Sequence, residues 1–167
     1  MAGTLREASL SVLRLTTAVR APVERVFDLS RSIDLHALST ARTGERAVAG
    51  VTSGLIGPDQ EVTWRARHLG VWQTLTSRIT AYDRPRHFRD SMVRGAFRRL
   101  DHDHFFEASG EGTVMTDVFD FDAPFRLLGR LVERVFLAAY MERFLRERNE
   151  AIKQAAEGEG WRTLLPP

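Results

Sequence analysis

Two histidines and two aspartates stand out because their types and spacing suit acid–base chemistry. His102 and His104 are two residues apart, and Asp90 and Asp117 lie before and after them in the chain. A histidine oriented by a carboxylate titrates near neutrality and can enolise or dehydrate a bound carbonyl compound. If the fold brings the four side chains together, they form a candidate catalytic or binding group.

The local sequence predicts that the fold does bring them together. In a strand from Arg99 to Glu107, His102 and His104 share a face with apolar Leu100 and Phe106, so both histidines point inward. A buried lone carboxylate is costly, so each aspartate needs a partner, and the imidazoles are the nearest by pattern. The residues expected beside the aspartates on the two neighbouring strands are Phe88 and Met92, and Met115 and Phe119.

Three interpretations of this His/Asp network remain open. The first is a structural polar cluster that orients a ligand's carbonyl or hydroxyl group. The second is acid–base catalysis by His102, His104, Asp90 and Asp117. The third is a metal site, because two histidines two apart on a strand and a carboxylate can offer three ligands. Our working prediction is that the protein contains no metal and no other cofactor.

The elements that must position these residues follow from hydrophobic periodicity and turn residues. An alternating strand is followed by two short helices, then by six strands separated by glycine and proline, which favours consecutive antiparallel hairpins. The predicted strands are residues 10–20, 45–51, 61–68, 71–82, 87–94, 99–107 and 113–121, and the predicted short helices are residues 22–29 and 32–36.

After residue 124 the period becomes that of a long helix, which continues to about Ala156. One large sheet must hide a face, and this helix is the element long enough to cover it. The prediction is a single α+β domain over residues 1–157, in which a curved antiparallel sheet wraps around the helix and encloses a cavity. Leu131 and Val135 should face the sheet and Arg148 should face solvent, while residues 158–167 read as a C-terminal tail.

Two blocks of sequence resemble the START-like helix-grip superfamily. The first is the run Ala-Pro-Val-Glu-Arg-Val-Phe at residues 21–27, and the order β-α-α-β₆-α agrees with it. The second, more specific block consists of Pro85, Phe88, Asp90, Gly95, Phe97, His102, His104 and Phe106. The chain looks closest to bacterial SRPBCC proteins of the polyketide cyclase/dehydrase type. The resemblance implies a helix-grip fold, but its members bind lipids, quinones or hormones, cyclise polyketides or bind proteins.

Composition narrows the choice of function. The chain has no cysteine, which excludes disulfides, zinc–thiolate sites and thiol catalysis. The net charge is only +2 and the arginines are scattered, so we expect no nucleic-acid binding. No signal-peptide pattern and no membrane-length apolar segment are visible, so we expect a soluble cytoplasmic protein without integral membrane association. A monomer and a homodimer paired through the strand at residues 45–51 are both open.

The sequence therefore favours a protein that binds a small, mainly hydrophobic molecule, such as a lipid, polyketide or isoprenoid, with the four His/Asp residues at its polar end. The first alternative is a cyclase or dehydrase that uses these residues as acid and base, and the second is a protein-interaction module. The residues predicted to contact the ligand are Trp64, His68, Phe88, Asp90, Met92, His102, His104, Phe106, Met115, Asp117, Phe119, Leu131 and Val135.

Overall fold

The computed structural model describes residues 12–68, 70–122 and 130–166, with side chains described from residue 135 onward in the last segment. The elements in chain order are β1 (Val12–Val19), α1 (Val23–Ser30), α2 (Ile33–Ser39), a 3-10 turn η1 (Ala41–Thr43), β2 (Arg46–Gly50), β3 (Glu61–His68), β4 (Val71–Asp83), β5 (His87–Arg94), β6 (Arg99–Ser109), β7 (Gly112–Asp122), α3 (Arg130–Glu157) and α4 (Trp161–Leu164).

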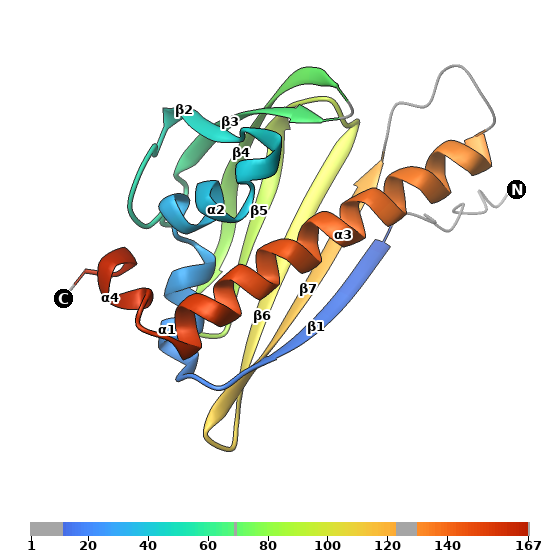
Figure 1. Ribbon diagram of the computed structural model, residues 1–167. Helices are drawn as coiled ribbons and strands as arrows, with labels where there is room; N and C mark the ends of the chain where they lie inside the picture. Colours follow the sequence, from blue (N-terminus) through green and yellow to red (C-terminus); the bar gives the residue numbers. More distant parts are fainter. Residues whose placement is uncertain (1–11, 69, 123–129, 167) are drawn as a thin grey trace, which may run out of the picture.

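The seven strands form one antiparallel sheet in the order β1-β7-β6-β5-β4-β3-β2. Every pair except β1 with β7 joins strands that follow one another in the chain, as expected for hairpins separated by glycine and proline. The sheet curves around α3, which runs diagonally across its inner face (Figure 1). The predicted α+β helix-grip architecture is confirmed.

The short helices α1 and α2 lie beside α3 and cover the rest of the inner face (Figure 1). Pro22 precedes α1, where its fixed backbone angle suits the start of a helix. The side chain of Ser32 caps α2 by accepting a hydrogen bond from the backbone N–H of Leu35. Val26 and Phe27 of α1 are fully buried against the sheet, so this helix is held by its apolar face.

The predicted elements agree with the structure within a few residues at most boundaries. The strands at 61–68 and 87–94 match at both ends, and the final helix ends at Glu157. Residues 10–11 and 123–129, parts of two predicted elements, lie outside the described residues. The segment expected to be a tail differs: it contains α4, and Trp161, Leu164 and Leu165 pack against the main core because they are apolar.

The interior contains two hydrophobic clusters rather than one. The first cluster, under α1 and α2, includes Phe27, Phe88, Phe106, Met115 and Ile152. The second cluster, where α3 crosses β1, β6 and β7, includes Leu15, Leu100, Phe119, Phe121 and Leu145. The strands β1, β6 and β7 and the helix α3 each contribute residues to both clusters.

A substitution of Gly50, at the end of β2, tests the tight contact between β2 and β3. Its φ is +73°, and a Cβ there would collide with the carbonyl oxygen of Glu61. Gly54 is a matched control, because its φ is +75° but a Cβ there would meet no atom within 4 Å. We expect Gly54→Ala to cost about 1 kcal/mol of unfolding free energy from backbone strain. Gly50→Ala should cost clearly more in urea unfolding, and equal losses would contradict the close approach of the two strands.

Candidate functional site

A layer of polar side chains separates the two hydrophobic clusters. Along β6, His104 and His102 lie between Phe106 of the first cluster and Leu100 of the second. Along β7, Asp117 lies between Met115 and Phe119 in the same way. The elements β1, β5 and α3 contribute at the same level, so the polar layer comprises Thr17, Asp90, His102, His104, Asp117, Arg148 and Asn149.

The four residues singled out from the sequence form the centre of this layer. His102 Nε2 lies 2.9 Å from Asp117 Oδ1, and His104 Nε2 lies 2.9 Å from Asp90 Oδ2. The two imidazole rings are 3.8 Å apart between centroids, and Phe88 stacks on the other side of His104 at 4.2 Å. The predicted pairing of histidines with aspartates is therefore present, and each pair joins two neighbouring strands.

One nitrogen of this network has no hydrogen-bond partner among the described residues. His104 Nδ1 is buried and lies 3.0 Å from Asp117 Oδ1, but the angles are not those of a hydrogen bond. Buried polar atoms in folded proteins are almost always satisfied by protein or water. His104 lines the cavity, but this nitrogen is buried beside Asp117 and therefore belongs to the interior of the polar layer.

Two residues of α3 complete the polar layer on its helix side. Asn149 Nδ2 donates to Asp117 Oδ2 at 2.7 Å, and Arg148 Nη1 lies 3.5 Å from Asp117 Oδ1. Arg148 also donates to the carbonyl oxygen of Ser30 at 2.9 Å, which satisfies a backbone acceptor at the end of α1. The charge of Asp117, whose surface is 0% exposed, is therefore balanced by side chains of both β6 and α3.

The pKa values reflect this crowding. Burial, followed by the charge of His104, lowers the pKa of His102 to about 4, against the opposing pull of Asp117 and Asp90. Burial alone would raise the pKa of Asp117, but His102 and His104 outweigh it and hold that pKa well below its usual value. The same balance lowers the pKa of Asp90. His102 is thus neutral at pH 7, unlike the near-neutral titration expected from sequence.

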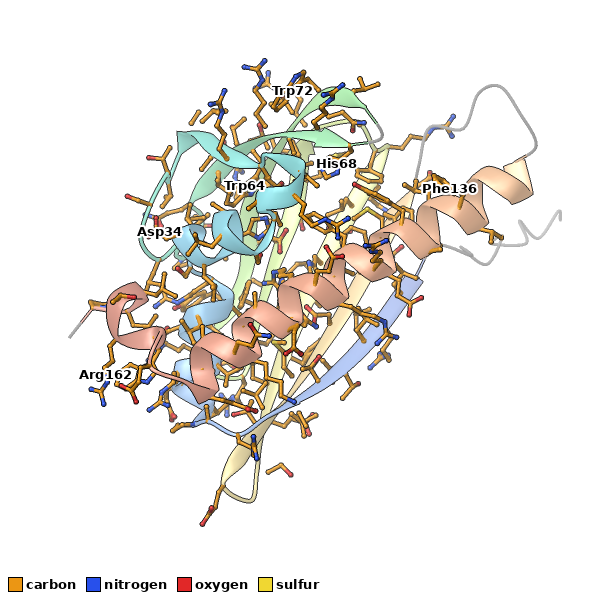
Figure 2. All side chains as sticks on the ribbon, in the orientation of Figure 1. Asp34, Trp64, His68, Trp72, Phe136 and Arg162 are labelled. Atoms are coloured by element: carbon orange, nitrogen blue, oxygen red, sulfur yellow. The ribbon has the colours of Figure 1, made fainter. Side chains whose placement is uncertain are left out.

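The polar layer faces a cavity of about 180 Å³ between the sheet, α2 and α3. Its wall is mainly apolar, and Asp90, His102, His104 and Arg148 supply polar groups at one end. His36, Glu45, His68, Gln73 and Tyr140 also line the cavity. Figure 2 shows Trp64 and His68 on β3, on the side of the molecule where α2 and the first half of α3 lie.

Seven of the predicted ligand-contacting residues line this cavity, and five others within the described residues do not. The lining residues are Trp64, His68, Phe88, Asp90, His102, His104 and Phe119. Phe106 and Met115 belong to the first cluster, Met92 packs on the second cluster, and Asp117 is fully buried behind the histidines. An inward direction on a strand leads either to the cavity or to packed core, and whether these four residues contact a ligand stays a prediction. The side chain of Leu131 lies outside the described residues.

Two predictions on α3 were wrong in orientation. Val135 is 62% exposed instead of facing the sheet, and Arg148 is 5% exposed instead of facing solvent. The face of α3 that lines the cavity carries Leu137, Tyr140, Met141, Phe144, Leu145 and Arg148, at steps of three and four residues. Val135 lies two residues from Leu137, which is more than half a turn away. A signal was available, because Arg148 and Asn149 are in phase with buried Leu145 and Ile152.

His36, Glu45 and Asn149 were also missed by sequence reasoning, whereas Tyr140 was expected on the inner face of the final helix and lies there. His36 lies on α2, Glu45 lies between η1 and β2, and Asn149 lies on α3. Polar residues of short helices and connections are usually exposed, so the types of His36 and Glu45 alone give no signal that they face a cavity.

Asp90, His102 and His104 could supply ligands to a metal ion, but the guanidinium of Arg148 lies in the same layer. One ligand atom from each of Asp90, His102 and His104 lies within 4.8 Å of the others. The guanidinium of Arg148 is bound next to Asp117 in the same layer and already supplies positive charge. Without a metal, these residues are held by the His102–Asp117 and His104–Asp90 hydrogen bonds. The absence of a metal stays a prediction.

A family model described as "Polyketide cyclase / dehydrase and lipid transport" matches residues 12–157, which spans β1 to the end of α3. The chain belongs to this family. Together with its fold, the match places it in the START-like SRPBCC superfamily, as the sequence resemblance predicted. No curated protein matches the chain in a sequence search.

Several solved structures have the same fold at low sequence identity. TTHA0849 from Thermus thermophilus is 19% identical with a TM-score of 0.68, covering 87% of this chain and 99% of its own. A START superfamily protein from Mycobacterium smegmatis is 11% identical with a TM-score of 0.65, covering 88% and 97%. Ginseng major latex-like protein 151 from Panax ginseng is 15% identical with a TM-score of 0.63, covering 88% and 97%. At these identities the comparison shows the fold.

No helix within the described ranges is both long and apolar enough to cross a membrane.

Asp117 is the residue of the polar layer whose charge the fold depends on most. We expect Asp117→Asn to lower the free energy of unfolding by about 3 kcal/mol, because it leaves the buried Arg148 less compensated. Asp120→Asn is a matched control on the same strand, where Asp120 pairs with Arg99 near the surface, and it should cost less than about 1 kcal/mol. Urea unfolding of both variants measures the difference, and similar losses would contradict the assignment.

His102 should make the protein less stable in mild acid. The unfolded chain takes up a proton at this residue near pH 6.5, whereas the folded protein does so only near pH 4. Between these values the unfolded state binds more protons, so the free energy of unfolding falls as the pH falls, by about 3 kcal/mol across the window. The lowered pKa values of Asp90 and Asp117 act in the same direction at still lower pH, below 3.8.

Urea unfolding from neutral pH to pH 4 tests this, with His102→Gln as the comparison. The variant should lack the part of the pH dependence that His102 contributes. If the free energy of unfolding depends on pH equally in both proteins, or if NMR shows His102 titrating near its ordinary pKa, the imidazole is not held neutral by the fold.

Proposed function

We propose that the protein binds a small, mainly hydrophobic molecule in the cavity, with its polar end against Asp90, His102 and His104. The observation that carries the proposal is the combination of a mainly apolar wall with a few convergent polar groups at one end. The wall supplies affinity by burying apolar surface, and the polar end fixes orientation. Asp117 acts from behind by holding both histidines in place.

The available atoms at this end suit a hydroxyl or carbonyl group. Asp90 is 25% exposed and offers carboxylate acceptor capacity toward the cavity. His104 also lines the cavity, but its Nδ1 is buried beside Asp117, so the hydrogen-bonding capacity at this end is mainly that of Asp90. The family description includes lipid transport, which agrees with a binding role.

A cyclase or dehydrase reaction is the second candidate, and the His/Asp pairs beside the cavity favour it. An imidazole next to two carboxylates has the parts of a general acid–base group. His102 is less suited to donating a proton at pH 7, because its pKa of about 4 keeps it neutral. In this alternative His104 is the catalytic group and Asp90 orients it.

Double replacement of His102 and His104 by Gln separates the two candidates. Native mass spectrometry of the purified protein should first detect a bound small molecule. In a binding protein the double variant should bind the probe decanol roughly tenfold more weakly, because apolar burial remains and polar contacts are lost. In an enzyme it should abolish turnover of a carbonyl substrate.

The control is His87→Gln, since His87 pairs with Asp103 away from the cavity lining. It should bind decanol like the wild type. If the wild type binds no apolar molecule at all, the proposed function is wrong, and a protein-interaction role becomes the better explanation.

A further inference from the structure

A second set of polar residues lines the same cavity at a distance from the polar layer. His36 Nε2 lies 3.3 Å from Glu45 Oε2, and His68 Nδ1 lies 2.8 Å from the hydroxyl of Tyr140. All four side chains line the cavity, and they come from α2, the connection after η1, β3 and α3. We call His36, Glu45, His68 and Tyr140 the second polar group.

Two independent measures give the separation between this group and the polar layer. On α3, Tyr140 and Arg148 are eight residues apart on the cavity-lining face, which corresponds to about 12 Å at about 1.5 Å per residue. On β4, Leu75 is paired with Trp64, and His36 of the second polar group packs on this tryptophan. On the same strand, Ile79 is paired with Asp90 of the polar layer. These positions are four residues apart, which corresponds to about 13 Å along the strand.

The wall between the two polar ends is mainly apolar, with the small polar side chain of Ser77 between Leu75 and Ile79 on β4. Met141, Phe144 and Leu145 line it from α3, and Leu75, Phe97 and Leu100 line it from the sheet side. A ligand that reaches both ends therefore needs an apolar body of this length. A shorter ligand with one polar group would leave one of the two polar ends without a partner in a mainly apolar cavity, which is unfavourable.

Charge argues against an anionic group at either end of the ligand. Asp90 at one end and Glu45 at the other are carboxylates that face the cavity. Burial would raise the pKa of Glu45, but His36 outweighs it and that pKa lies below its usual value, so Glu45 is ionised at pH 7. Of the lining arginines, Arg148 lies beside Asp117 and Arg31 is paired with Asp28 at 2.7 Å. An anionic ligand group would meet a carboxylate at either end.

The second polar group also has capacity left for a ligand. The hydroxyl of Tyr140 makes one hydrogen bond within the described part of the chain, to His68, and a hydroxyl can both donate and accept. Burial, followed by the charge of Glu45, raises the pKa of Tyr140, so the hydroxyl keeps its proton. The Glu45 side chain is 7% exposed and that of His36 is 22% exposed, so contact with water is limited.

We propose that the cavity binds an elongated, non-anionic molecule with an apolar body and a hydroxyl or similar hydrogen-bonding group at each end. This inference rests on the proposed binding function and adds the ligand class. One end of the molecule lies at Asp90 and His104, and the other lies at Glu45, His68 and Tyr140.

A matched pair of probes tests the second end. Decanol has one terminal hydroxyl, and the decanediol with a hydroxyl at each end differs only by the second group. Their affinities are measured by displacement of anilinonaphthalene sulfonate from the wild type, Tyr140→Phe and Tyr82→Phe. Tyr82 is the matched control, because it packs on Phe27 and is not among the lining residues.

We expect Tyr140→Phe to weaken decanediol binding roughly two- to tenfold relative to decanol, which corresponds to the loss of one hydrogen bond. Tyr82→Phe should leave both affinities unchanged. Glu45→Gln is a second variant that should shift the same ratio, and thermal unfolding establishes that each variant is folded.

The outcomes separate the two proposals. If the wild type binds decanol but neither Tyr140→Phe nor Glu45→Gln changes the ratio of the two affinities, the second end is wrong and the binding function stands. If the wild type binds neither probe, the binding function is wrong and the inference fails with it.

Discussion

The buried carboxylate of Asp117 is the constraint around which the interior is organised. An ion with no exposed surface must be compensated by charge and hydrogen bonds, or it destabilises the fold by several kcal/mol. His102 and His104 approach it from β6, and Arg148 and Asn149 approach it from α3. The position of α3 across the sheet is therefore fixed by polar contacts as well as by apolar packing.

The same contacts connect the scaffold to the binding site. Arg148 joins Asp117 to the last turn of α1 through the carbonyl of Ser30, and its side chain lines the cavity. The histidines held by Asp117 present their other surfaces to the cavity. A single set of interactions thus stabilises the packing of sheet on helix and sets the orientation of the groups that we propose contact a ligand.

The sequence predicted the sheet side of the site well and the helix side poorly. Strand alternation has a period of two, so the inward direction of His102 and His104 and their pairing with Asp90 and Asp117 followed from position alone. A helix distributes residues over a full circle, and a charged residue such as Arg148 is usually placed outside. Its helical phase with Leu145 and Ile152 indicated the inner face, but its partner Asp117 is a tertiary contact that local pattern does not contain.

The sequence predicted that a cavity exists, but not which residues line it. Met115 and Trp64 both point inward from their strands, but Met115 is in packed core and Trp64 borders the cavity. Which of the two occurs depends on how α1, α2 and α3 fill the space above each residue. The contacts of Tyr140 and Glu45 could not be assigned for the same reason, because these residues meet His68 and His36 only in the folded chain.

The polar layer also specifies how the strands are aligned. A slip of two residues between β6 and β7 keeps every inward side chain inward, so apolar patterning alone cannot exclude it. In the observed alignment Asp117 is opposite His104, with Met115 opposite Phe106. A two-residue slip one way would place the carboxylate opposite Phe106, and the other way would place it opposite His102, with Met115 opposite His104. The first misalignment removes the carboxylate from both histidines, and the second leaves His104 opposite an apolar side chain, so the layer favours the observed pairing much as a single buried asparagine does in a coiled coil.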